Sequence, residues 1–182
     1  MGRKASAANA LNWLMAQGFD VVAVLTDDHL PGSPTAKVAR TWNIPVLSLD
    51  ELYKRIQAGT IQFDLGISFV YWKIIKEPLI SFPSCGVINF HPAPLPDYRG
   101  LAGYNLAILE GVDYWGLTAH YINAGIDTGT IIDVFKFSID PDEETVVSLE
   151  RTSQEFMLRL FKKTIRRVDE ARGKLPTTPN TG

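Results

Sequence analysis

Apolar residues recur every third or fourth position in several segments of the chain, as they do on one face of a helix. The first such segment ends at Gly18, a position where a left-handed residue is typical of a helix end. Ser33 followed by Pro34 is typical of a helix start, and Ser48-Leu49-Asp50-Glu51 has the form of a capping box. We therefore expect helices at residues 5–17, 33–43, 48–59, 104–110 and 149–168.

Short apolar runs between these segments predict β-strands. They cover residues 19–25, 44–47, 63–70, 87–90, 115–122 and 130–139. Because strands alternate with helices, the chain is predicted to form an α/β domain with a doubly wound, mostly parallel sheet flanked by helices. We expect this domain to span residues 1–175, with residues 176–182 as a C-terminal tail. Ligands of such sheets bind beyond the carboxyl ends of the strands.

Composition limits the class of protein. The 182 residues are 46% hydrophobic and 21% charged, as in a folded chain with a core. No apolar run reaches the roughly 18 residues of a membrane span, and the first residues lack the apolar core of a signal peptide. The single cysteine, Cys85, excludes an internal disulfide. We therefore expect a cytoplasmic protein that does not bind a membrane.

The charge of the chain does not indicate a nucleic-acid-binding surface, because the formal net charge is −2. A basic cluster does occur near the C-terminus, at Lys162, Lys163, Arg166 and Arg167. A solvated helix face is the favoured interpretation of this cluster, and a phosphate-binding patch is the alternative.

An amide and an imidazole occur together at the carboxyl end of the strand predicted at residues 87–90. Because side chains alternate along a strand, Asn89 and His91 point to the same side. Pro92 favours extended geometry at His91, and two further prolines within the next four residues stiffen the segment. The pair predicts a site, although a capping asparagine beside a half-buried histidine is the alternative.

A second candidate is the loop Gly125-Ile126-Asp127-Thr128-Gly129. Its two glycines allow the backbone to approach a ligand closely, with the Asp127 carboxylate between them. Asp and Gly are also common turn residues, so a plain hairpin turn is the alternative.

The remaining reactive side chains are interpreted as structural. His120 lies within a predicted strand and is expected to be a satisfied core histidine, while His29 is expected to be solvated. Cys85 has no adjacent base and is expected to be a buried, inert thiol. The three histidines lack metal-ligand spacing, so no metal is expected.

Three motifs taken together resemble one family. They are Asn89-Phe90-His91-Pro92, Leu95-Pro96-Asp97-Tyr98-Arg99-Gly100 and Gly125-Ile126-Asp127-Thr128-Gly129. They resemble the formyltransferases that use 10-formyltetrahydrofolate, closest in layout to the amino-sugar N-formyltransferases, and the resemblance covers about residues 19–139. It implies a Rossmann-like fold, catalytic roles for Asn89, His91 and Asp127, and 10-formyltetrahydrofolate as formyl donor without a metal. It also implies that the pterin ring contacts the backbone of two segments, residues Trp72, Lys73, Ile74 and Ile75 and residues Asn123, Ala124 and Gly125 of the loop that ends at Asp127.

The implied reaction accounts for these residue types. An amine attacks the formyl carbon, and Asn89 and a protonated His91 donate hydrogen bonds to the oxygen on which negative charge develops. Asp127 accepts the proton lost by the amine, directly or through a water, and favours the charged form of His91.

Two departures from the family pattern affect the expected fold and acceptor. The apolar first strand of the family has no counterpart here, and Gly2-Arg3 resembles the end of the turn that follows it. We therefore expect two unpaired strand edges, and a misplaced start or a truncated chain.

The acceptor is expected to be a small-molecule primary amine, that of an amino-sugar nucleotide, and nucleic acid is not expected as a partner. The Gly-rich turn of the glycinamide ribonucleotide enzymes and the further domain of the methionyl-tRNA enzymes are not seen. A formyltetrahydrofolate hydrolase, a glycinamide ribonucleotide formyltransferase and a non-catalytic folate-binding domain are the alternatives. A homodimer is left open.

Overall fold

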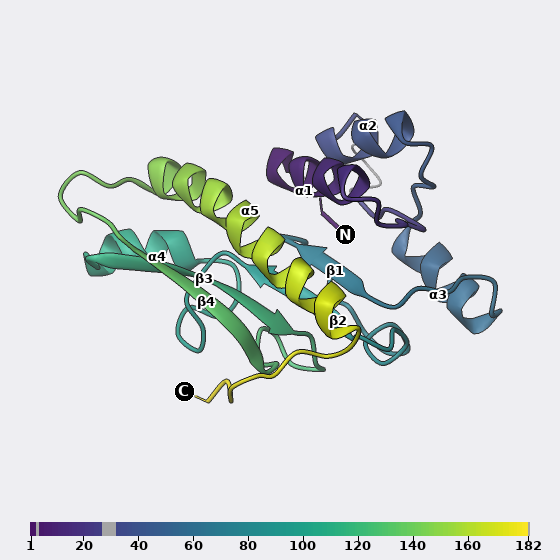
Figure 1. Cartoon of the computed structure of the whole chain (residues 1–182). Helices are drawn as coiled ribbons and strands as arrows, with labels where there is room; N and C mark the ends of the chain where they lie inside the picture. Colours follow the sequence, from purple (N-terminus) through teal and green to yellow (C-terminus); the bar gives the residue numbers. More distant parts are fainter. Residues whose placement is uncertain (3, 27–31, 182) are drawn as a thin grey trace. The chain divides into compact units, whose positions relative to one another are not determined.

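The computed structural model describes residues 1–2, 4–26 and 32–181. The chain forms two compact units, Met1–Val87 and Ile88–Gly182, each described by itself below. Figure 1 shows the elements in chain order. The predictions for Arg3 and His29 lie outside the described residues.

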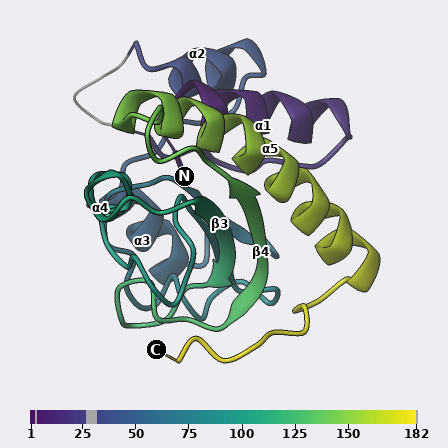
Figure 2. The same ribbon diagram turned by 90° about the vertical axis from the view of Figure 1, so that its left-hand side faces the viewer.

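The first unit contains three helices and one strand. They are α1 (Ala5–Ala16), α2 (Pro34–Thr41), α3 (Leu49–Gln57) and β1 (Gly66–Phe69). The helix ends follow local chemistry, because the Ser33 hydroxyl accepts from the backbone of α2 and Ser48 and Glu51 cap α3 reciprocally. Helices α1 and α2 pack side by side over a small apolar cluster of Leu11, Val24, Ala39 and Ile44 (Figure 2).

The strands predicted at residues 19–25 and 44–47 do not form. The two segments meet in one parallel bridge between Val24 and Val46, with the Val24 N–H donating to Pro45 and the Leu47 N–H to Val24, both at 2.9 Å. The start of each segment is bound to the preceding helix, because the Phe19 N–H donates to Leu14 and the Ile44 N–H to Ala39. These donors are therefore not available for a longer ladder.

Met1 and Gly2 form backbone hydrogen bonds to two different segments, one at Leu25 and one at β1. The Gly2 N–H donates to Leu25 at 3.0 Å, and the Phe69 N–H donates to the Met1 carbonyl at 2.8 Å. The Met1 amino group donates to Ile67, and burial lowers its pKa to about 5. A Cβ on Gly2 would lie 2.6 Å from that of Ala7, so the close approach requires glycine. The expected open edges are therefore paired at these positions.

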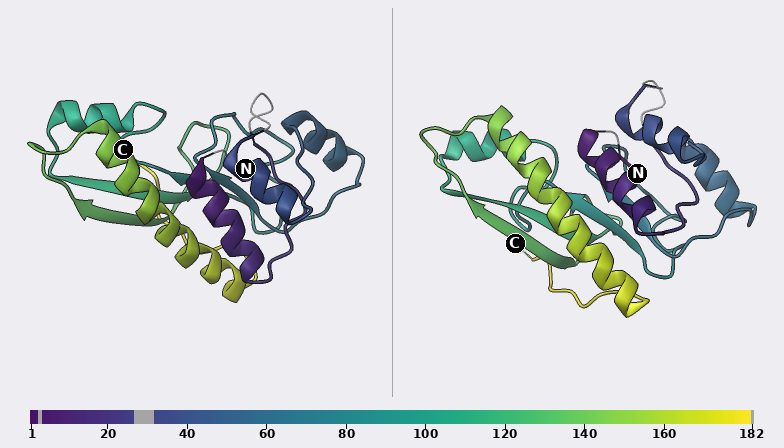
Figure 3. Two further views of the ribbon diagram at one scale, coloured as in Figure 1. Left: turned by 90° about the horizontal axis from the view of Figure 1, so that it is seen from above. Right: turned by 45° about the horizontal axis from the view of Figure 1, so that its top comes forward.

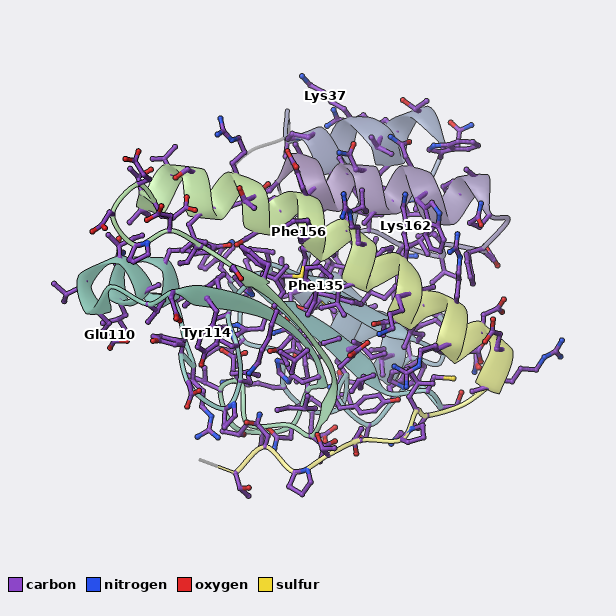
Figure 4. All side chains as sticks on the ribbon, turned by 60° about the vertical axis from the view of Figure 1, so that its left-hand side comes forward. Lys37, Glu110, Tyr114, Phe135, Phe156 and Lys162 are labelled. Atoms are coloured by element: carbon purple, nitrogen blue, oxygen red, sulfur yellow. The ribbon has the colours of Figure 1, made fainter. Side chains whose placement is uncertain are left out.

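The second unit contains the antiparallel strands β2 (Val87–His91), β3 (Tyr114–Tyr121) and β4 (Ile131–Ser138). Helix α4 (Gly103–Glu110) precedes β3, and helix α5 (Val146–Ala171) follows β4. Helix α5 crosses β3 and β4 (Figure 3) and packs through apolar residues such as Phe161, whose ring lies 5.1 Å from that of Phe90. Phe156 of α5 lies against Phe135 of β4 in the same way, with ring centroids 5.1 Å apart (Figure 4).

The antiparallel pairing in this unit differs from the mostly parallel sheet that was expected. The connection at residues 122–130 is too short for a helical crossover, so β3 and β4 can only pair antiparallel. Hydrophobic periodicity does not report strand direction, but the length of this connection does, and the prediction of a mostly parallel sheet did not take that length into account.

The basic cluster of α5 is partly neutralised. Lys163 and Arg167 lie 2.6 and 3.7 Å from the Asp133 carboxylate of β4. Within the described residues, no helix combines the length and the apolar character needed to cross a membrane.

Candidate active site

Asn89 and His91 lie on β2 and point to the same side of the strand, as alternation predicts. The Asn89 amide donates to Asp127 Oδ1 at 3.2 Å, and His91 Nδ1 lies 3.4 Å from Asp127 Oδ2. Two of the three predicted catalytic residues, Asn89 and His91, therefore both contact the carboxylate of the third, Asp127. His91 is buried, and Asn89 is half-buried.

Asp127 lies in the loop between β3 and β4, with a left-handed backbone (φ +50°) that Asp tolerates better than most residues. The Gly100 N–H donates to its Oδ2 at 3.0 Å, so both carboxylate oxygens have partners. The sequence alone links Gly129 to a close approach by a ligand. In the structure the residue at this position must be glycine because a Cβ there would lie 1.7 Å from the Tyr121 carbonyl. The close approach at this glycine is thus to the protein's own backbone.

A fourth residue, His120, belongs to the same cluster. Its Nε2 lies 3.0 Å from the Asn89 amide nitrogen and 3.5 Å from Asp127 Oδ1, and its Nδ1 lies 2.8 Å from the Tyr121 carbonyl. Since a carbonyl can only accept, Nδ1 carries the hydrogen. Nε2 then accepts from Asn89, whose other amide hydrogen goes to Asp127.

The sequence interpretation of His120 as only a satisfied core histidine is therefore incomplete. His120 stands directly opposite Asn89 in the register of β2 and β3. That pairing joins residues far apart in the chain, and the only local signal for it is the alternation of polar residues Thr118 and His120 in an otherwise apolar strand.

His91 has an oxygen on each side. Its Nε2 donates to the Tyr98 carbonyl at 2.9 Å, and its Nδ1 faces Asp127. Burial lowers the pKa of His91 below its ordinary value, and this outweighs the opposite effects of Asp127 and the Tyr98 carbonyl. The expectation of a protonated His91 is therefore corrected, because the residue is mostly neutral at pH 7. A neutral imidazole with its hydrogen on Nε2 is still a donor.

The Asp127 carboxylate is ionised near neutral pH. Burial by itself raises its pKa, but contacts with His120, His91 and the Gly100 N–H together outweigh burial and hold the pKa below its usual value. The site therefore combines an amide donor, an imidazole donor and a fixed anion, which is a set suited to transfer of an acyl group to an amine.

The residues expected to contact the pterin ring are divided between the two units. In the loop that precedes Asp127, Asn123, Ala124 and Gly125 are exposed, and the Asn123 side chain accepts from Gly125 and Thr128. In the first unit, Trp72 and Ile74 are exposed, Lys73 is half-buried with its ammonium 5.8 Å from the Trp72 ring centroid, and Ile75 is buried. That the two segments bind one ring stays a prediction.

Two further expectations concern the remaining reactive groups. Cys85 is a buried free thiol, as predicted. Among residues 1–2, 4–26 and 32–181, no group of His, Cys, Asp and Glu side chains is arranged to hold a metal ion.

Fold and site together define an α/β protein of Rossmann-like class with an amide, imidazole and carboxylate cluster at the end of a strand. The sequence model of a family described as formyl transferase matches residues 16–165. The chain therefore belongs to the formyl transferase family. The predicted α/β, Rossmann-like class is confirmed, whereas the pairing within the sheet is mixed and not mostly parallel.

Individual relatives agree with this assignment. The chain is 32% identical over 153 residues to the methionyl-tRNA formyltransferase of Nitrosomonas eutropha, covering 78% of this chain and 48% of that protein. It thus spans about half the length of the curated relatives that it matches.

Solved structures agree as well. The N-formyltransferase from Helicobacter canadensis, in complex with folinic acid and dTDP-3-aminofucose, gives a TM-score of 0.82 at 27% identity over 100% of this chain and 66% of that one. The phosphoribosylglycinamide formyltransferase from Bacillus halodurans gives 0.78 at 25% identity over 92% of each chain.

Proposed function

We propose that this chain transfers a formyl group from 10-formyltetrahydrofolate to a primary amine. The observation that carries the proposal is the contact of both Asn89 and His91 with the Asp127 carboxylate in a chain of this family. In the reaction, the formyl carbon gains a bond to the amine nitrogen and loses its bond to the donor nitrogen. The amine loses one proton and the departing donor nitrogen takes up one, so that the protons balance.

Asn89 and His91 are the proposed donors to the formyl oxygen. A hydrogen-bond donor aimed at a developing oxyanion typically contributes about 10²–10³ in rate. Both amide hydrogens of Asn89 are bonded inside the site, to His120 and Asp127. The single hydrogen of a neutral His91 is bonded to the Tyr98 carbonyl. For Asn89 or His91 to donate to the formyl oxygen, one of these bonds therefore has to be exchanged.

Asp127 is the proposed acceptor of the amine proton. With a lowered pKa it is a weak base, but it is ionised over the whole neutral range. The amine nitrogen becomes strongly acidic as its bond to carbon forms, so a weak, well-placed carboxylate is sufficient. The Gly100 N–H keeps the carboxylate in place at 3.0 Å.

The formyl donor is proposed to lie against residues 72–75 and 123–125. The folinic acid in the Helicobacter canadensis structure supports a folate ligand for this fold. Trp72 in the first unit and Ala124 in the second are both exposed, as contact with a ligand requires.

The proposed acceptor is the amine of an amino-sugar nucleotide. The dTDP-3-aminofucose complex supports it, because all of this chain aligns with 66% of that protein at a TM-score of 0.82. Methionyl-tRNA is the second candidate, because curated methionyl-tRNA formyltransferases are 30–32% identical to the chain.

The test is an acceptor screen with 10-formyltetrahydrofolate. We expect a dTDP-amino sugar to gain the mass of one formyl group, and Asp127→Asn to abolish most of the gain. Formylation of methionyl-tRNA or glycinamide ribonucleotide instead would overturn the proposed acceptor and support the proposed formyl transfer. Formate release without any acceptor would identify a hydrolase, and folate binding without turnover would identify a binding domain.

A further inference from the structure

The segment that follows α5 runs back along the sheet to the loop that contains Asp127 (Figures 1 and 2). Leu175 is buried, and its N–H donates to the Tyr121 hydroxyl at 2.7 Å. Thr178 pairs with Ile131 at the start of β4 through two hydrogen bonds of 2.8 and 2.9 Å. Residues 175–180, here named the strap, are thus attached to both strands that flank the loop.

The strap ends on the loop through one side chain. Asn180 Nδ2 donates to the Asp127 carbonyl at 2.9 Å and to the Gly129 carbonyl at 2.8 Å. Arg99 in turn donates to the Asn180 backbone carbonyl at 2.9 Å and to its side-chain oxygen at 3.2 Å. Because both amide hydrogens of Asn180 are directed to the loop and its oxygen is held by Arg99, the amide has one defined orientation.

These bonds form a closed ring around Asp127. Arg99 holds Asn180, Asn180 holds the Asp127 backbone, and the next residue, Gly100, holds the Asp127 carboxylate at 3.0 Å. Asp127 has a left-handed backbone, a conformation that costs energy for any residue with a side chain. Contacts from outside the loop are therefore needed to keep this conformation, and its carboxylate direction follows from it.

We propose that Asn180 is a positioning residue, which holds the Asp127 backbone so that the carboxylate stays on His91. The catalytic consequence rests on the proposed formyl transfer, whereas the positioning itself does not. Asn180 lies far from Asp127 in the sequence and touches only its main chain, so it acts through Asp127 and not on the reacting atoms.

Three variants and one control test the proposal. Asn180→Ala removes both donations, Asn180→Asp keeps the shape but sets a carboxylate against two carbonyls, and Asn180→Gln retains an amide. Thr177→Ala changes an exposed strap residue and serves as the matched control.

The first measurement is steady-state kinetics. We expect kcat to fall about tenfold to a hundredfold in Asn180→Ala and Asn180→Asp, because a shift of about 1 Å in a catalytic group has effects of this size. The KM values for donor and acceptor should stay within about twofold, since Asn180 is not proposed to bind either one. Asn180→Gln should recover part of kcat, and Thr177→Ala should match the wild type.

The second measurement does not need activity. The ring nitrogens of His91 are titrated by NMR in each variant. The groups that face His91 are Asp127, His120 and the Tyr98 carbonyl, and of the two ionisable ones only Asp127 raises its pKa. If Asn180→Ala lets Asp127 move away, the titration midpoint of His91 falls further below its wild-type value.

The outcomes separate the two proposals. A wild-type chain without formyl transfer overturns the proposed function, and the His91 titration then decides the role of Asn180 alone. Wild-type kcat together with an unchanged His91 midpoint in Asn180→Ala overturns the positioning role. If Asn180→Ala does not fold, the isosteric Asn180→Asp decides on the same two readouts.

Discussion

The side chains proposed as donors, Asn89 and His91, and the carboxylate proposed as base, Asp127, are held in different ways. Asn89 and His91 stand on β2, where pairing with β3 sets their direction residue by residue. Asp127 stands on a loop with a left-handed backbone, held by Gly100 and Asn180. The strand pair therefore depends on a ladder of many backbone bonds, whereas the loop depends on a few contacts from distant parts of the chain.

The largest effect is expected at the loop carboxylate itself. Asp127→Asn removes the proposed proton acceptor and leaves the size of the side chain unchanged. We expect kcat to fall by about 10²–10⁴, the usual contribution of a positioned acid or base. Formyl transfer at saturating donor and acceptor measures the loss, and the exposed Asp97→Asn should be unaffected. Equal kcat in both variants would remove Asp127 from the mechanism.

A somewhat smaller loss is expected on the strand. Asn89→Ala removes one donor to the formyl oxygen, so kcat should fall by about 10²–10³. The same change removes the hydrogen bonds from Asn89 to His120 and Asp127, so the melting temperature should also fall by a few degrees. A large drop in melting temperature with intact activity in the surviving protein would show that Asn89 is structural.

The loop can also be disturbed without touching a catalytic group. Gly129→Ala places a Cβ 1.7 Å from the Tyr121 carbonyl, so the backbone must move. We expect a loss of about 1–3 kcal/mol in the free energy of unfolding, as for other overpacked sites, together with reduced kcat. Gly32→Ala is the matched control, because no atom of the described residues lies within 4 Å of its added Cβ. If urea unfolding and kcat do not distinguish the two variants, the loop is not tightly held.

The smallest effect is a pH dependence of stability at the strand. Burial lowers the pKa of His91, so the folded state favours the neutral ring. Its contribution is complete above the ordinary pKa of about 6.5 and is lost as the pH falls through that value toward the folded pKa. Asp127, whose pKa is also lowered, adds a similar loss only below about pH 4. His91→Gln should therefore reduce the change in the urea unfolding midpoint between about pH 7 and 5. If the midpoint of the variant depends on pH in the same way as that of the wild type, the lowered pKa is not that of His91.

Local features were predictable wherever one short stretch contains all the partners. The capping box of Ser48 and Glu51 and the cap at Ser33 are present, because each bonds within three residues. The shared direction of Asn89 and His91 follows from strand alternation alone. In the first unit, by contrast, the strand predicted at residues 19–25 forms only one bridge, because a strand also needs a partner along its length.

The amino-acid sequence by itself determined the helix caps, the Asn89 and His91 pair and the membership of a formyl transferase family, since these rest on neighbouring residues and on motif spacing. Only the tertiary structure decided that His120 stands opposite Asn89, that burial outweighs Asp127 at the His91 ring, and that Asn180 lies on the catalytic loop. The physical reason is that register, desolvation and long-range hydrogen bonds depend on which distant segments of the chain come into contact. The local periodicity of a sequence does not indicate these contacts.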